Sequence, residues 1–287
     1  MPYIHSLEKK LRSFILQKSL SPLESICRKN YTIDNTTSNE DVKILFKKLK
    51  ECDSSFDLIR IGEPGDGSYI IPNDLGEIKH CISLGYGGIM TFENHLATLG
   101  IDSVIVDPVV PENNLENVIF VNKFIGSTSE SERRTITLSD LIKNYIDGED
   151  GFSSDLILQM DIELDEWLVL NTLSTETLLR FRILIIEFHS LHLLRHKWIF
   201  SKVISPIIEN LTKNHYVAKL EITHGSGMWS LNGKEWFPDT IEVTFHRRDR
   251  KSTEKKTNQI RYQSISGLHD RHQRRIMSFE KLMQENC

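Results

Sequence analysis

Short apolar runs alternate with helix-like segments through the middle of the chain, and this alternation restricts the fold more than any other feature. The runs contain few polar residues, as is typical of strands that are buried on both faces of a parallel sheet. Helical segments between such strands predict a mostly parallel sheet with helices on both faces, the doubly wound, Rossmann-like α/β class. The runs are Cys81–Leu84, Val104–Val106, Val118–Val121, Leu156–Met160 and Ile183–Ile186.

Helical spacing of apolar residues fills the gaps between these runs. It predicts helices over Thr91–Leu99, Leu138–Tyr145 and Lys197–Leu211. A later apolar run, Ile241–Phe245, is expected to pair antiparallel at the edge of the sheet.

Further helices are expected outside this region, over residues 4–20, over residues 38–50, and from about His269 onward. They flank the alternating pattern on both sides. We therefore divide the chain into a helical N-terminal extension (1–52), a Rossmann-like domain (53–250) and a basic helical C-terminal tail (251–287).

Composition limits the class of protein. Hydrophobic residues make up 39% and charged residues 26% of the 287 residues, as in folded globular proteins, and the net charge of -5 gives no overall attraction to polyanions. The four cysteines form no C-x-x-C pair, which favours a reducing compartment. No apolar run approaches the roughly 20 residues that span a bilayer, and charged residues interrupt the N-terminal 20. We expect a cytoplasmic protein without a membrane span.

Two basic runs stand out against the acidic total, His246–Lys256 and Arg271–Arg275. Each is open to two interpretations, a phosphate-binding face or solvated surface, and we favour solvated surface because runs of mixed charge are usually that. Nucleic acid is therefore not an expected partner. The terminal helical segments are candidates for a homodimer contact.

A glycine loop follows the first strand, and an acidic residue ends the second. Gly85, Tyr86 and Gly87 follow Leu84, and Asp107 follows Val106. Glycines let a backbone approach a ligand closely, and an acid in this position can accept hydrogen bonds from ribose hydroxyls. Together they indicate a cofactor that contains adenosine. The dinucleotide fingerprint fails because Met90 occupies its third glycine position, whereas S-adenosylmethionine has no pyrophosphate to hold and tolerates a looser loop.

Ionisable residues gather where later strands end. Asp161 follows the fourth strand, His189 lies just beyond the fifth, and His224 lies near another strand end. Because neighbouring parallel strands end at one edge, Asp161 and His189 are expected to be neighbours. The three residues could bind a divalent metal, or a histidine could be the general base for a substrate hydroxyl. A purely structural role for each histidine is the alternative.

Several short motifs follow one another in order over residues 58–248. They are Arg60-Ile61-Gly62, Asp66-Gly67-Ser68-Tyr69, Ile82-Ser83-Leu84-Gly85-Tyr86-Gly87, Thr91-Phe92-Glu93, Thr137-Leu138-Ser139-Asp140-Leu141-Ile142, Met160-Asp161-Ile162-Glu163, Glu166-Trp167, Ile186-Glu187-Phe188-His189, His224-Gly225-Ser226 and Glu242-Val243-Thr244. Their order resembles the FkbM-like family of S-adenosylmethionine-dependent class I methyltransferases. Ser83, Leu164 and Ser68 depart from the family pattern; Leu164 stands where the family usually has glycine.

The resemblance implies a class I methyltransferase fold and roles for particular residues. Asp107 would hold the ribose, and Asp161 would stand between cofactor and acceptor. The loop residues would face the methionine part of the cofactor. The implied cofactor-binding set is Gly85, Tyr86, Gly87, Glu93, Asp107, Asp66 and Tyr69.

We therefore expect methyl transfer from S-adenosylmethionine to a hydroxyl of a carbohydrate, sugar nucleotide or related small molecule, in glycan (polysaccharide) or natural-product biosynthesis. Asp161, His189 and His224 are the expected catalytic residues or metal ligands. Two alternatives remain: an NAD-dependent oxidoreductase, and a noncatalytic protein that binds through its basic tail.

Overall fold

The computed structural model describes residues 36–112, 114–129, 134–147, 155–252 and 270–284, with only the backbone described for 270–274. Contacts divide the chain into Met1–Thr36 and Thr37–Cys287, and the helices and strands named below belong to the second unit. The helix expected over residues 4–20 lies outside the described residues.

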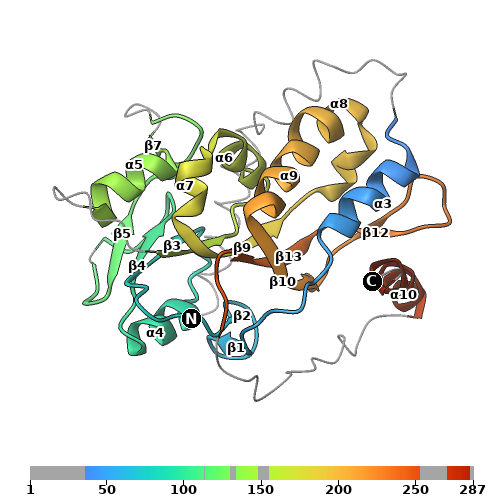
Figure 1. Cartoon of the computed structure of the whole chain (residues 1–287). Coiled ribbons are helices and arrows are strands. Elements are labelled where there is room, and N and C mark those ends of the chain that lie inside the picture. Colours follow the sequence, from blue (N-terminus) through green and yellow to red (C-terminus); the bar gives the residue numbers. More distant parts are fainter. Residues whose placement is uncertain (1–35, 113, 130–133, 148–154, 253–269, 285–287) are drawn as a thin grey trace. The chain divides into compact units, whose positions relative to one another are not determined.

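A seven-stranded sheet forms the centre of the unit (Figure 1). Its spatial order is β10-β13-β9-β8-β3-β4-β5. The five strands from β9 to β5 are parallel, as predicted. The strands are β3 (His80–Leu84), β4 (Asp102–Val106), β5 (Val118–Val121), β8 (Leu156–Met160), β9 (Phe181–Phe188), β10 (His215–Ile222) and β13 (Ile241–Arg247).

The position of β13 differs from the prediction. It is antiparallel to its neighbours, as expected, but it lies between β9 and β10 rather than at the edge. The edge belongs to β10, which the sequence did not reveal because Lys219 and Glu221 interrupt its apolar pattern. Only part of β10 is buried, as is usual for an edge strand.

Helices and a hairpin cover the two faces of the sheet (Figure 1). On one face α6 and α7 pack on β9, and α9 packs on β10. On the other, α4 packs on β4, and the hairpin of β1 and β2 packs near β9 and β13. The elements are β1 (Leu58–Ile61), β2 (Tyr69–Pro72), α4 (Thr91–Thr98), α6 (Glu166–Thr172), α7 (Thr175–Leu179) and α9 (Ser205–Asn214).

The remaining elements connect or extend these layers. The helix expected over Lys197–Leu211 is three segments, α8, a π-helical turn and α9, and Pro206 lies in the first turn of α9. The others are β6 (Phe124–Ile125), β7 (Thr135–Ile136), α5 (Leu138–Ile142) with a π-helical turn (Lys143–Asp147), a 3₁₀ helix (Leu191–Arg195), α8 (Lys197–Ile199) with its π-helical turn (Phe200–Ile204), β11 (Met228–Trp229) and β12 (Phe237–Pro238).

Two helices from opposite ends of the unit meet. Helix α3 (Asn39–Lys48) begins at Ser38, whose hydroxyl caps it by accepting a hydrogen bond from the amide of Asp41. Its buried Phe46 ring packs edge-on against Phe279 of α10 (Asp270–Gln284), with ring centroids 5.1 Å apart. The tail helix therefore packs on the same unit as α3. None of the described helices is long and apolar enough to cross a bilayer.

The start of the first basic run is structural. His246 and Arg250 pair with the buried carboxylate of Asp74 at 3.0 and 2.7 Å, and Arg247 pairs with Asp155 at 2.6 Å. His246 is fully buried. These residues join the end of β13 to segments beside β2 and β8, so they are neither solvated surface nor an open phosphate-binding face.

Candidate functional site

The five parallel strands end at the same edge of the sheet, and the candidate site is built on the carboxyl ends of four of them. The strands are β3, β4, β8 and β9, which end at Leu84, Val106, Met160 and Phe188. Loops that leave this edge are where ligands bind in open parallel sheets.

Gly85 lies where the ends of β3 and β8 meet. Its φ is +95°, and a Cβ there would lie 1.9 Å from the carbonyl oxygen of Asp161. Its amide donates to Val106 at 3.0 Å, and the amide of Asp161 donates to Leu84 at 2.9 Å. Both the backbone angle and the contact exclude a side chain, so the first glycine of the loop is required by the chain itself.

Asp107 holds this loop in place. One carboxylate oxygen accepts the amide of Tyr86 at 3.0 Å, and the other accepts the amide of Val109 at 2.7 Å. The residue is buried, and the Tyr86 ring packs against Phe120. These two backbone hydrogen bonds tie the loop after β3 to the end of β4.

The rest of the loop is more open. A Cβ at Gly87 would have no neighbour within 4 Å in the part of the chain that the structure describes. The turn between β1 and β2 packs beside the loop, because the Thr91 hydroxyl donates to the carbonyl of Gly67 at 2.7 Å. Asp66 is exposed on that turn. The structure thus brings Gly85, Tyr86, Gly87 and Asp107 together and puts the turn that carries Asp66 next to them.

Glu93 and Tyr69 belong to a buried polar chain beneath the loop. The Ser83 hydroxyl lies 2.6 Å from the Glu93 carboxylate and 2.6 Å from the Gln159 side chain, which also bonds the Tyr69 hydroxyl at 3.0 Å. Burial raises the pKa of Glu93 and the pKa of Tyr69. The Glu93 carboxylate faces Ser83 inside the protein, so this geometry gives it a packing role under the site.

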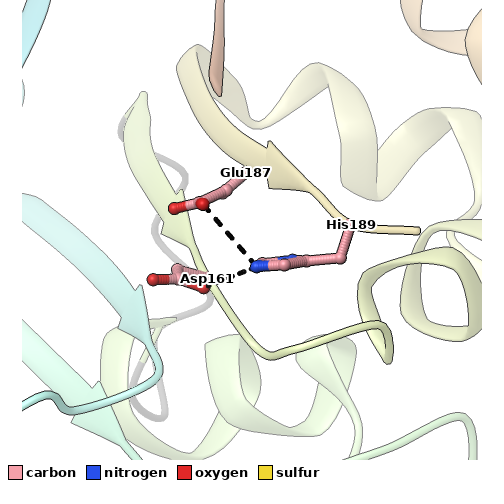
Figure 2. Close-up of side chains that lie close together, drawn as sticks. All are labelled: Asp161, Glu187 and His189. Carbon is pink, nitrogen blue, oxygen red and sulfur yellow. Dashed lines mark ion pairs between the residues drawn. The ribbon is translucent and has the colours of Figure 1, made fainter. Parts of the chain in front are cut away.

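A second group lies at the ends of β8 and β9, shown in Figure 2. Nε2 of His189 lies 3.6 Å from a carboxylate oxygen of Asp161 and 3.6 Å from one of Glu187. The expectation that Asp161 and His189 are neighbours is confirmed. One ligand atom from each of the three residues lies within 4.8 Å of the others, a spacing that a metal ion could occupy.

Glu166 fixes the other side of the imidazole. It is fully buried at the start of α6, and one carboxylate oxygen accepts the amide of His189 at 2.7 Å and lies 3.3 Å from its Nδ1. The other oxygen accepts the amide of Leu164 at 2.8 Å. The His189 ring is therefore held with Nε2 toward Asp161 and Glu187.

Burial and crowding change the acidity of this group. Burial, together with the charge of Glu187, raises the pKa of Asp161 to about 7. Burial also raises the pKa of Glu187. For His189 burial acts in the opposite direction, but the hydrogen bond to Glu166 and the nearby carboxylates outweigh it and raise its pKa to about 9. Without a bound cation, the group therefore favours protonated forms.

The loops around this group contain left-handed backbone. Glu163 and Leu164 have φ of +54° and +94°, and Ser190 has φ of +55°. Such conformations cost non-glycine residues energy and concentrate at functional sites. The Leu164 position is the one where the resemblance led us to expect glycine.

His224 is not part of the group. It is exposed in the turn that follows β10. The third residue of the group is Glu187, where the sequence predicted His224. The signal for Glu187 was present, because residues two apart on a strand share a face and His189 follows it by two. Nearby, His192 is hydrogen-bonded through Nδ1 to Asp239 at 2.8 Å. Sequence reasoning did not single out that pair.

A row of glutamates extends the acidic character across the sheet. Glu187 of β9 is opposite Glu242 of β13, which is opposite Glu221 of β10. Burial and the charge of Glu221 raise the pKa of Glu242 to about 8. Like charges directly opposite each other destabilise a sheet, so this row favours protonated carboxyl groups.

Comparison with known protein families finds no match, and a search of curated proteins finds no significant match. The case for a function therefore depends on the geometry of these residues.

Proposed function

We propose that the chain is an S-adenosylmethionine-dependent O-methyltransferase of the class I fold that acts on a hydroxyl of a carbohydrate or related small molecule. The observation that carries the proposal is the pairing of Asp107 with the glycine loop. The Asp107 carboxylate lies at the end of β4 and binds the amide of Tyr86. In open α/β sheets this is the position of an acid that accepts ribose hydroxyls.

The strand order supports the class I fold. In chain order the seven strands of the sheet are β3, β4, β5, β8, β9, β10 and β13, so the spatial order reads 6-7-5-4-1-2-3. This is the dinucleotide-binding order 3-2-1-4-5-6 with one added antiparallel strand between the fifth and sixth. A sheet of this order is compatible with the Rossmann-like fold that the resemblance implies.

The NAD-dependent alternative fits less well. Its fingerprint needs a third glycine where this chain has Met90. The alternative of a noncatalytic protein that binds through its basic tail stays open, because His246, Arg247 and Arg250, which pair with Asp74 and Asp155, lie before that tail.

Methyl transfer needs little covalent help from the protein. The acceptor oxygen attacks the methyl carbon, the C–S bond breaks, and the sulfonium becomes a neutral thioether while the hydroxyl loses its proton. The main task of the protein is to align the acceptor oxygen with the methyl group. The glycine loop after β3 is held for this task by Asp107 at one end and by the bond of Thr91 to Gly67 at the other. The backbone of Asp161 abuts Gly85, so Asp161 is the residue we assign between cofactor and acceptor. Asp161 and His189 then control the hydroxyl proton, directly or through a cation that they hold.

Calorimetric titration tests the proposal, with NAD as the control ligand. We expect micromolar binding of S-adenosylmethionine and at least tenfold weaker binding in Asp107→Ala. Asp102→Ala is the matched control, because this exposed acid lies at the opposite end of the same strand; it should bind like the unmodified chain. Binding of NAD alone would favour the oxidoreductase, and binding of neither cofactor would refute the proposal.

A further inference from the structure

We propose that Asp161, Glu187 and His189 bind one divalent metal ion through two carboxylate oxygens and one imidazole nitrogen. The binding itself is independent of the proposed function. Its role toward an acceptor, given below, rests on that function.

The spacing of the three residues leaves room for an ion. Nε2 of His189 lies 3.6 Å from oxygens of both Asp161 and Glu187. These separations are too long for hydrogen bonds, which are about 2.7–3.2 Å. With metal–ligand bonds of about 2.1 Å, a separation of this size corresponds to a ligand–metal–ligand angle of about 120°, close to the angles in four-coordinate sites. The three ligand atoms all lie within 4.8 Å of one another, so they surround an open centre.

Glu166 prepares the histidine as a ligand. Its carboxylate faces Nδ1, and backbone amides of Leu164 and His189 hold it there. A proton on Nδ1 leaves the lone pair of Nε2 directed at Asp161 and Glu187. Histidine ligands of metals are commonly oriented by a carboxylate in this way.

Asp161 supplies an independent observation. Its Oδ1 is buried and, among the described residues, has no hydrogen-bond partner. A buried carboxylate oxygen without a hydrogen bond is costly, and a coordinated cation would remove that cost. This same oxygen is the one 3.6 Å from His189 Nε2.

The chemistry of the group indicates which ion it takes. Two carboxylates favour Mg²⁺ or Mn²⁺, and the imidazole favours Zn²⁺, Fe²⁺ or other transition metals. Mn²⁺ accepts both ligand types and is the probe we choose. Three protein ligands leave open positions, which adjacent hydroxyls of a sugar acceptor would fill. Coordination would lower the pKa of the reacting hydroxyl and hold it in line with the methyl group.

The test is titration of the chelator-treated full chain with Mn²⁺, with free Mn²⁺ followed by electron paramagnetic resonance. We expect saturable binding of one equivalent and at least tenfold weaker binding in Glu187→Gln. Glu163→Gln is the matched control, because its carboxylate also faces His189 at 3.8 Å but lies outside the group and is 68% exposed. It should change affinity less than threefold. No saturable binding, or equal weakening in both variants, would overturn the proposal.

Two further measurements keep the outcomes separate. Circular dichroism and melting show whether each variant folds; if Glu187→Gln does not, Asp161→Asn replaces it in the same comparison. The S-adenosylmethionine titration is repeated on the same samples. Mn²⁺ binding without cofactor binding would support the metal site and refute the methyltransferase. Cofactor binding without Mn²⁺ binding would support the methyltransferase and refute the metal site.

Discussion

The backbone at Leu164 predicts that glycine is a more stable replacement there than alanine, the reverse of their usual order. Its φ is +94°, and the preceding Glu163 is also left-handed at +54°. A left-handed conformation costs a residue with a Cβ about 1–2 kcal/mol. Glycine avoids that cost, whereas alanine does not.

The comparison is between Leu164→Gly and Leu164→Ala, because both variants remove the same side chain contacts. Glycine loses about 0.5–1 kcal/mol relative to alanine from the entropy of the unfolded chain. After subtraction we expect Leu164→Gly to be more stable than Leu164→Ala by about 1 kcal/mol. In a chain of this size that difference is about 2–4 °C in melting temperature.

Urea denaturation measures the free energy of unfolding of both variants, and calorimetry measures the melting temperature. The same pair of substitutions at Leu168 is the control, because it lies inside helix α6. There glycine should be the less stable by about 1 kcal/mol. If alanine is also the more stable residue at position 164, the left-handed loop between β8 and α6 does not exist as described.

The remaining predictions concern the glycine loop and the histidine. Gly85→Ala should destabilise the fold by several kcal/mol or prevent folding, since its Cβ would lie 1.9 Å from a backbone oxygen. Gly87→Ala should melt at the normal temperature but bind the cofactor more weakly. Thermal melts with and without S-adenosylmethionine check both predictions. Glu166→Gln removes the carboxylate whose hydrogen bond most raises the pKa of His189, so NMR titration should find that pKa below about 9. Urea denaturation should find the free energy of unfolding lower by about 1.5–3 kcal/mol. An unchanged pKa of His189 would contradict the contact with Glu166. In metal-free protein, the raised pKa of His189 stabilises the fold fully below pH 6.5, and this stabilisation is lost as the pH rises through about 9. The free energy of unfolding should therefore fall between these two pH values. The fall should be smaller in His189→Gln.

Much of the sheet could be predicted because its strands are almost uniformly apolar and end in polar residues. Asp107 and Asp161 could be located at strand ends for the same reason, and the neighbourhood of Asp161 and His189 followed from parallel strands ending at one edge. The position of β13 could not be predicted, because Lys219 and Glu221 hide the pattern of its neighbour β10.

The missed features of the site depend on contacts between distant segments. Glu166 reads as a favourable charge at a helix start, and only the fold shows that it holds the ring of His189. His224 was chosen because it lies near a strand end, yet the turn after β10 leaves it exposed. The irregular turn before α9 also escaped prediction. Pro206 offers no amide for helical pairing with the preceding turn, which breaks the regular helix there.

The most direct test of the central claim is to locate the bound cofactor. Methyl-labelled S-adenosylmethionine is crosslinked to the full chain by ultraviolet light, and the labelled peptide is identified by mass spectrometry. We predict label within residues 85–109, which contain the glycine loop and Asp107, and loss of that label when unlabelled cofactor competes. Absence of competable label, or competable label confined to β10 or α10, would contradict the proposed cofactor site.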